Sequence, residues 1–143
     1  MKTMLTTKRP ENSYDSSGLH ELTDFLISKF IRIAESNRSF FINEIPAHLQ
    51  FSADKQMLTS VLNGLFSAVV INATDSCIRL SAKSYGNMVL LQVKESSSLN
   101  SSSFENEVRK LQPMAEKMRG SVEVTSHRKE LTTITFAFPN IPL

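Results

Sequence analysis

The sequence has little that would tie it to a membrane or an oxidising compartment. It contains one cysteine, Cys77, which excludes an internal disulfide and a cluster of cysteine metal ligands. Its apolar neighbour Ile78 predicts a buried, inert thiol in a strand. No apolar run approaches the roughly 20 residues of a membrane span, and the N-terminus lacks the apolar stretch of a secretory signal. We therefore expect a cytoplasmic protein without a membrane partner.

A large excess of either charge is also missing. Sixteen Lys and Arg residues stand against fourteen Asp and Glu residues, which gives a formal net charge of +2. The basic residues are scattered along the sequence, which argues against a nucleic-acid partner. With 41% hydrophobic and 21% charged residues, the composition is that of a globular protein. Residues 1–17 are polar and predict a flexible N-terminal arm, so the domain should span residues 18–143.

Hydrophobic periodicity predicts the first two helices. Apolar residues spaced three and four apart predict a helix from Leu19 to about Ser36. A second helix should follow Asp54, whose carboxylate can accept hydrogen bonds from the first free backbone N–H groups. Its wide apolar face should be the best buried surface of the protein. That face consists of Met57, Leu58, Val61, Leu62, Leu65, Val69 and Val70.

A third apolar stripe, from Phe104 to Met118, predicts a helix with a break. Ser102 and Glu105 match a capping box at its start. Pro113 lies inside the stripe and should kink or split the helix. Gly120 should end the helix in the left-handed conformation.

Five strands should alternate with these helices. Gly86-Asn87 is expected to supply the positive φ angles of a tight hairpin turn. Clustered strands beside three helices predict an α+β fold, a two-layer α/β sandwich whose mixed, mostly antiparallel sheet carries all helices on one face. The expected strands are Phe40–Pro46, Cys77–Ala82, Met88–Val93, Val122–Thr125 and Thr132–Phe138.

Five strings match the motifs of one family in order and spacing: Leu19-His-Glu-Leu22, Phe41–Pro46, Asp54–Leu62, Met118–Ser126 and Thr132–Pro139. They resemble the ATP-binding catalytic domain of sensor histidine kinases, in the superfamily of gyrase, Hsp90 and MutL. The resemblance covers residues 19–139. It implies the histidine-kinase-like ATPase fold and a site for magnesium-bound ATP.

The resemblance also identifies positions where that site is degenerate. The family's helix motif Asn-Leu-Leu-x-Asn-Ala places a magnesium ligand at its second asparagine, and the aligned positions here are Gly64 and Ala68. Neither side chain offers the oxygen that Mg²⁺ requires. Asn63 and Asn72 lie close by in sequence and are candidates for residual nucleotide contacts. A shift of one residue turns a side chain by about 100° on a helix, so Asn63 replaces the lost ligand only if the alignment slips.

The adenine-binding motif of the family, Asp-x-Gly-x-Gly, corresponds to Glu95-Ser-Ser-Ser-Leu99. Glu95 keeps the charge but is one methylene longer, and it remains a candidate contact to a base. Ser97 and Leu99 place side chains where the family has glycines, so the backbone cannot approach a nucleotide as closely. The segment before the third helix contains no glycine, which implies that the family's lid and phosphate-binding turn are missing.

The histidines do not indicate a catalytic site. His20-Glu-Leu22 resembles the phosphoacceptor string of the kinases' dimerisation helices, but Phe25 stands at the position of the family's proline. We therefore expect His20 to be an exposed helix residue. His48 and His127 have no acid or nucleophile at a recognisable spacing and receive no role.

These features favour a non-catalytic protein-binding module of two-component-type signalling, with no cofactor and no bound metal. The resemblance implies a response regulator, a sensor kinase or a phosphotransfer domain as partner, and a homodimer is a further option. Contacts are expected at the first helix and at Ser96–Asn106. There Leu99 and Phe104 are candidate apolar anchors, with core burial the favoured interpretation of Phe104.

The alternative is an ATP-binding catalytic domain of a divergent sensor histidine kinase or of an anti-sigma-type serine kinase. It would bind ATP and Mg²⁺ through Glu95 and through Asn63 or Asn72. The sequence also leaves open whether the chain is part of a larger protein.

Overall fold

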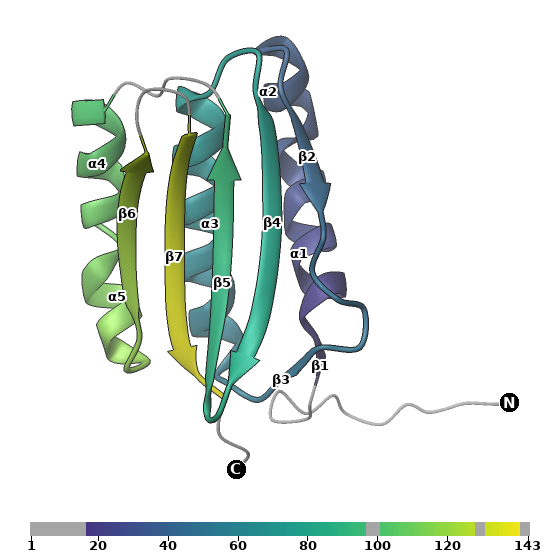
Figure 1. Cartoon of the computed structure of the whole chain (residues 1–143), viewed down its shortest axis with the longest axis vertical. Helices are drawn as coiled ribbons and strands as arrows, with labels where there is room; N and C mark the ends of the chain where they lie inside the picture. The colour runs from purple at the N-terminus through teal and green to yellow at the C-terminus, as the bar shows by residue number, and fades with distance from the viewer. Residues whose placement is uncertain (1–16, 97–100, 128–130, 141–143) are drawn as a thin grey trace, which may run out of the picture.

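One five-stranded sheet with all helices on one face forms the domain (Figure 1). The computed structural model describes residues 17–96, 101–127 and 131–140. The strand order is β2-β4-β5-β7-β6; β2 pairs with β4 in parallel, and the other neighbours are antiparallel. The expected α+β sandwich is thereby confirmed. The strands are β2 Phe40–Asn43, β4 Cys77–Tyr85, β5 Met88–Glu95, β6 Ser121–His127 and β7 Leu131–Pro139.

The helical layer has more segments than the sequence predicts. The first helical region is continuous to Ser36 but contains a 3₁₀ turn that separates α1 from α2. Two strands of two residues each, Ser17–Gly18 (β1) and Gln50–Phe51 (β3), form a separate antiparallel pair. They are too short to leave a periodic pattern. The helices are α1 Leu19–Ile27, η1 Ser28–Phe30, α2 Ile31–Ser36, α3 Lys55–Asn72, α4 Ser101–Arg109 and α5 Gln112–Lys117.

Helix α3 is the centre of the helical layer and lies behind β5 and β7 in Figure 1. Its N-cap is Asp54, as predicted, whose side chain accepts hydrogen bonds from the backbone N–H groups of Gln56 and Met57 at 3.0 and 3.1 Å. The predicted apolar face is buried except for Met57 at its start, which is half-buried. One edge contact joins Phe66 of α3 to Phe41 of β2, with ring centroids 6.1 Å apart.

The β4–β5 hairpin is longer than predicted, and its pairing extends to Tyr85 and Met88. Only Gly86 and Asn87 remain in the turn. Gly86 has a positive φ of 56°, whereas Asn87 does not, so the sequence-based expectation holds for the glycine alone. The hairpin itself is confirmed.

The break in the third helix lies where Pro113 predicts it. α4 ends at Arg109, and α5 has its proline in the first turn, where a missing N–H leaves no hydrogen bond unmade. The helix begins at Ser101, so Ser102 lies in the first turn and is not the N-cap. The residue with positive φ is Arg119 at 64°, not Gly120. A Cβ at Gly120 would lie 2.3 Å from the carbonyl oxygen of Ala137, so close approach of β7 requires this glycine.

Gln112 closes part of the free edge of β6. Its side-chain amide donates to the carbonyl oxygen of Val122 at 2.5 Å and accepts from the Val122 N–H at 3.3 Å. A side-chain amide thus takes the place of a neighbouring strand and covers an edge that would otherwise be open to pairing.

We expect Gln112→Ala to lower the free energy of unfolding by about 1–2 kcal/mol, because both backbone groups lose a partner at a partly buried site. Gln112→Glu can still accept a hydrogen bond from the Val122 N–H but cannot donate one to the carbonyl. Its free energy of unfolding should therefore lie between those of the original protein and the alanine variant. Urea denaturation followed by circular dichroism measures both values. Equal stability of all three proteins would contradict this role.

Candidate functional site

Buried polar side chains gather at one end of the sheet, the upper end in Figure 1. There α3 and β5 end and β4, β7 and α4 begin. All buried polar residues of the described ranges except Thr23 lie at this end. Because burying unpaired polar groups is costly, such a cluster marks either a hydrogen-bonded structural network or the remains of a site. These residues are Ser39, Ser76, Glu95, Thr132 and Thr133.

Glu95 is the centre of the cluster. It is the last residue of β5, faces the helical layer and is 0% exposed. Its Oε2 accepts a short hydrogen bond from the hydroxyl of Ser76, and Thr132 lies directly opposite on β7. Ser76 in turn donates its N–H to the hydroxyl of Ser39 at 3.1 Å. The carboxylate that the sequence aligns with the family's base-binding aspartate is thus hydrogen-bonded inside the protein.

The first of the two aligned positions on α3, Gly64, is covered by Leu111 from the segment that joins α4 to α5. Leu111, between these helices, packs on Gly64 so closely that a Cβ there would lie 2.4 Å from a methyl carbon of the leucine. Ala68, one turn further on, is 5% exposed. Even an alanine at position 64 would require the end of the Leu111 side chain to shift, and an asparagine would require a larger movement. The sequence predicts that ligands are missing at these positions, but it gave no sign of the contact between Leu111 and Gly64.

The candidate asparagines do not converge on a common point. Asn72 donates its side-chain amide to the carbonyl of Ala68 at 2.7 Å, within its own helix. Asn63 is nine positions earlier (72 − 63), which places it about half a turn around the helix. Its Oδ1 is buried and accepts no hydrogen bond within the described ranges. Ser97 and Leu99 lie outside the described residues, and no group of three His, Cys, Asp or Glu residues in the described part could hold a metal ion.

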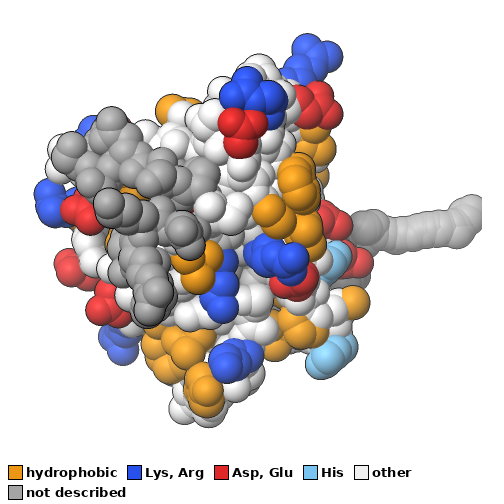
Figure 2. All heavy atoms as spheres, turned by 45° about the horizontal axis from the view of Figure 1, so that its top comes forward, with side chains coloured by type: hydrophobic (Ala, Val, Ile, Leu, Met, Phe, Trp, Pro, Cys, Tyr) orange, Lys and Arg blue, Asp and Glu red, His pale blue; other side chains and the backbone are white. Residues whose placement is uncertain are grey.

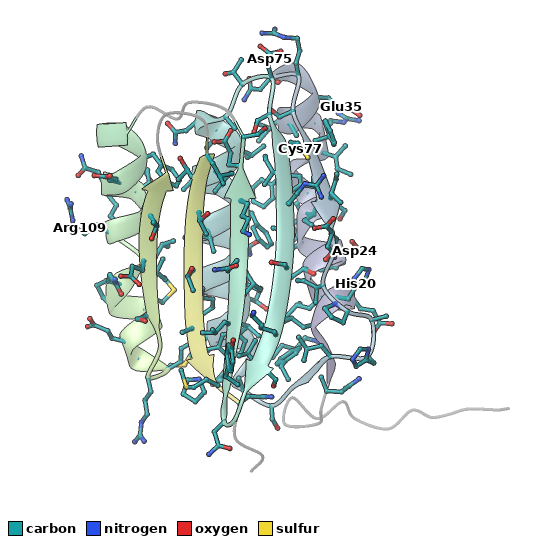
Figure 3. All side chains as sticks on the ribbon, in the orientation of Figure 1. His20, Asp24, Glu35, Asp75, Cys77 and Arg109 are labelled. Atoms are coloured by element: carbon teal, nitrogen blue, oxygen red, sulfur yellow. The ribbon has the colours of Figure 1, made fainter. Side chains whose placement is uncertain are left out.

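His20 is half-buried and links α1 to the end of β2, whereas the sequence predicts an exposed residue. Its Nδ1 is 2.6 Å from the carbonyl oxygen of Ile45, and its Nε2 is 3.4 Å from the carboxylate of Asp24 (Figure 3). Asn43 completes the link by donating to the carbonyl of His20 at 3.1 Å. The prediction failed because the partner, Ile45, follows a strand 25 residues away. Cys77 is likewise only half-buried, because it lies on the face of β4 opposite to Ile78.

Of the expected contact residues, Phe104 is 1% exposed and belongs to the core. The first helix does present an apolar side chain, since Phe25 is 63% exposed. Phe25 borders a groove of about 600 Å³ between α1 and the start of α3. This groove lies at the end of the domain opposite to Glu95.

Comparison with known proteins identifies the fold. No protein-family model and no curated protein matches the sequence, whereas solved structures do. The Acinetobacter baumannii histidine kinase AdeS matches with a TM-score of 0.77 at 8% identity, over 92% of this chain and 69% of AdeS. The catalytic domain of histidine kinase ThkA matches with a TM-score of 0.73 at 14% identity, over 92% of this chain and 100% of that domain. Full-length ShkA in complex with AMPPNP matches with a TM-score of 0.75 at 13% identity, over 94% of this chain and 33% of ShkA.

These neighbours define the class. The chain has the histidine-kinase-like ATPase fold, as the sequence motifs predict. At such low identity the likeness concerns architecture, and activity has to be argued from the residues of the site.

Proposed function

We propose that the chain is a non-catalytic protein-binding module of two-component-type signalling, built on a histidine-kinase-like ATPase fold that has lost its nucleotide site. The observation that carries this proposal is the contact of Leu111 with Gly64. The side chain of Leu111 packs on the first of the two positions that the sequence aligns with the family's asparagines.

The chemistry of phosphoryl transfer supports the same conclusion. Transfer from ATP depends on metal, phosphate cradle and positioning groups acting together. Ala68 supplies no oxygen for Mg²⁺, and the carboxylate of Glu95 is buried and bonded to Ser76. A protein that retained catalysis would need replacements for each of these groups, and the candidates Asn63 and Asn72 point to different sides of α3.

One observation favours the alternative, an ATP-binding domain of a divergent sensor histidine kinase or an anti-sigma-type serine kinase. Glu95 keeps an acidic group at the end of β5, with Thr132 directly opposite. A hydrogen-bonded carboxylate at this position resembles a base-binding group, and the neighbour ShkA is complexed with AMPPNP. Under this alternative, base binding would require Glu95 to leave Ser76.

A protein partner is the natural ligand of a module without a nucleotide. The neighbour ThkA was solved in complex with the response regulator TrrA, and it matches this chain with a TM-score of 0.69 at 16% identity over 90% of this chain and 42% of that one. We infer a response regulator, a sensor kinase or a phosphotransfer domain as the partner. The cytoplasm is the expected site of action. Among the described residues, no helix combines the length and apolarity needed to span a membrane.

Thermal unfolding with and without Mg-ATP tests the proposal. A ligand at 100 times its dissociation constant adds about 2.7 kcal/mol to the free energy of unfolding, which raises the melting temperature by several degrees. We expect no shift at millimolar Mg-ATP or Mg-AMPPNP. Full-length ShkA, which was solved in complex with AMPPNP, is the positive control under the same conditions. A reproducible shift that Glu95→Gln removes would establish the alternative.

A further inference from the structure

The face of the sheet turned toward the viewer in Figure 1 carries no helix in the described part of the chain. The central strands β4, β5 and β7 present alternate side chains to this open face. Every charged side chain that they present there is basic: Arg79 and Lys83 from β4 and Lys94 from β5. The acidic residue of these strands, Glu95, points inward and is buried.

The positive charge of this face is only partly compensated. Arg79 forms an ion pair with Glu44 at 2.7 Å. Lys94 lies directly opposite Arg79 in the strand register, an arrangement in which like charges destabilise the pair. Neither Lys94 nor Lys83 forms an ion pair within the described residues; the amine of Lys83 lies 5.4 Å from the ring centroid of Tyr85. The part of the face over β4 and β5 therefore attracts negative charge, whereas the register places the acidic Glu123 on β6, two strands from β5 and opposite Thr135 of β7.

Basic and apolar side chains are combined in a shallow groove between β4 and β5. The groove has a volume of about 540 Å³ and includes Lys94, Lys83, Tyr85 and Leu90. Leu90 is opposite Lys83 in the register. Figure 2 shows basic and hydrophobic side chains side by side on this face. Arg79 and Lys83 are four residues apart on β4, so these two basic side chains leave the sheet about 13 Å apart along the strand.

We propose that this open face binds an amphipathic helix of a protein partner that carries acidic residues about eight positions apart with an apolar residue between them. Eight positions span about 12 Å of helix, close to the distance along β4 between Arg79 and Lys83. The intervening apolar side chain would contact Leu90 and Tyr85. The inference depends on the proposed function for its premise that the ligand is a protein.

A single-stranded nucleic acid is the less suitable occupant. Such ligands are bound by grooves of many basic residues with several aromatic side chains for base stacking. In the described residues this face has three basic side chains, one already paired with Glu44, and two exposed aromatics, Tyr85 of β4 and Phe40 of the edge strand β2.

Selection from a phage-displayed library of helical peptides tests the proposal, with the full chain as target. Clones retained by the chain but not by Lys83→Glu/Lys94→Glu should carry Asp or Glu at the predicted spacing. A peptide synthesised from such a clone should bind the double variant at least about tenfold more weakly, and its affinity should fall with salt. The matched control is Lys55→Glu/Lys117→Glu, which makes the same charge change on exposed lysines of the helical layer and should bind normally.

Several outcomes would overturn the proposal: no enrichment, basic consensus sequences, or equal binding to both charge-reversed proteins. Tighter binding of an oligouridylate than of any selected peptide would assign the face to nucleic acid. Circular dichroism checks that the variants fold, and Lys83→Gln/Lys94→Gln gives a milder second test with an expected intermediate loss. The result is independent of nucleotide binding, so an Mg-ATP shift would refute the proposed function without altering the peptide measurement.

Discussion

Restoring the family's asparagine at position 64 should damage this protein. We expect Gly64→Asn to lower the free energy of unfolding by about 3 kcal/mol, because the new side chain must displace Leu111, which lies 2.4 Å from the position of a Cβ. Forced insertion into a packed core costs about 1–3 kcal/mol, and the asparagine amide would also be buried without a designed partner. Urea denaturation gives the value.

A double variant separates the steric cause from a general effect on α3. Gly64→Asn combined with Leu111→Ala should be more stable than the sum of the single changes predicts, since the smaller side chain makes room for the larger one. Ser60→Asn, on the exposed side of the same helix, should change stability by less than about 0.5 kcal/mol. If Gly64→Asn is as stable as the original protein, or gains an Mg-ATP shift, the helix contact does not close the site.

Removal of the buried carboxylate should have the second large effect. We expect Glu95→Ala to cost about 3 kcal/mol, since it leaves a cavity and deprives the buried hydroxyl of Ser76 of its acceptor. Glu95→Gln keeps an acceptor oxygen of similar reach and should cost about 1 kcal/mol. Chemical denaturation of the original protein and the two variants under identical conditions measures the order of their free energies of unfolding.

The ranking of the two variants distinguishes a structural role of Glu95 from a ligand-binding one. A network that holds β4 and β5 together predicts that the alanine variant is much less stable than the glutamine variant. Near-equal stability of all three proteins would show that the hydrogen bond to Ser76 contributes little. It would also strengthen the case that Glu95 is kept for a ligand.

Local rules predicted much of the backbone. The Asp54 cap depends on a carboxylate two and three residues before the N–H groups it binds, and the break at Pro113 depends on a missing N–H. Both are decided within one turn of helix. The hairpin at Gly86 is also a short-range feature, which is why its position could be read from the sequence.

Predictions failed where the deciding partner was distant in sequence. Gly120 appeared to be a left-handed helix end, yet Arg119 takes that conformation, and the glycine is needed because Ala137 lies against it. His20 appeared exposed, but Ile45 and Asn43 hold it half-buried. Cys77 appeared buried because its neighbour Ile78 is apolar, whereas alternation along β4 places the thiol on the other face.

The sequence by itself determined the fold class and the order of the main elements, because these depend on residue identity and short spacings. Only the tertiary structure decided what packs against the aligned position Gly64. The packing of Leu111 on Gly64 and the hydrogen bond between His20 and Ile45 each join residues far apart in the chain. Their contact is fixed by the packing of helices on each other and on the sheet, which no local pattern encodes.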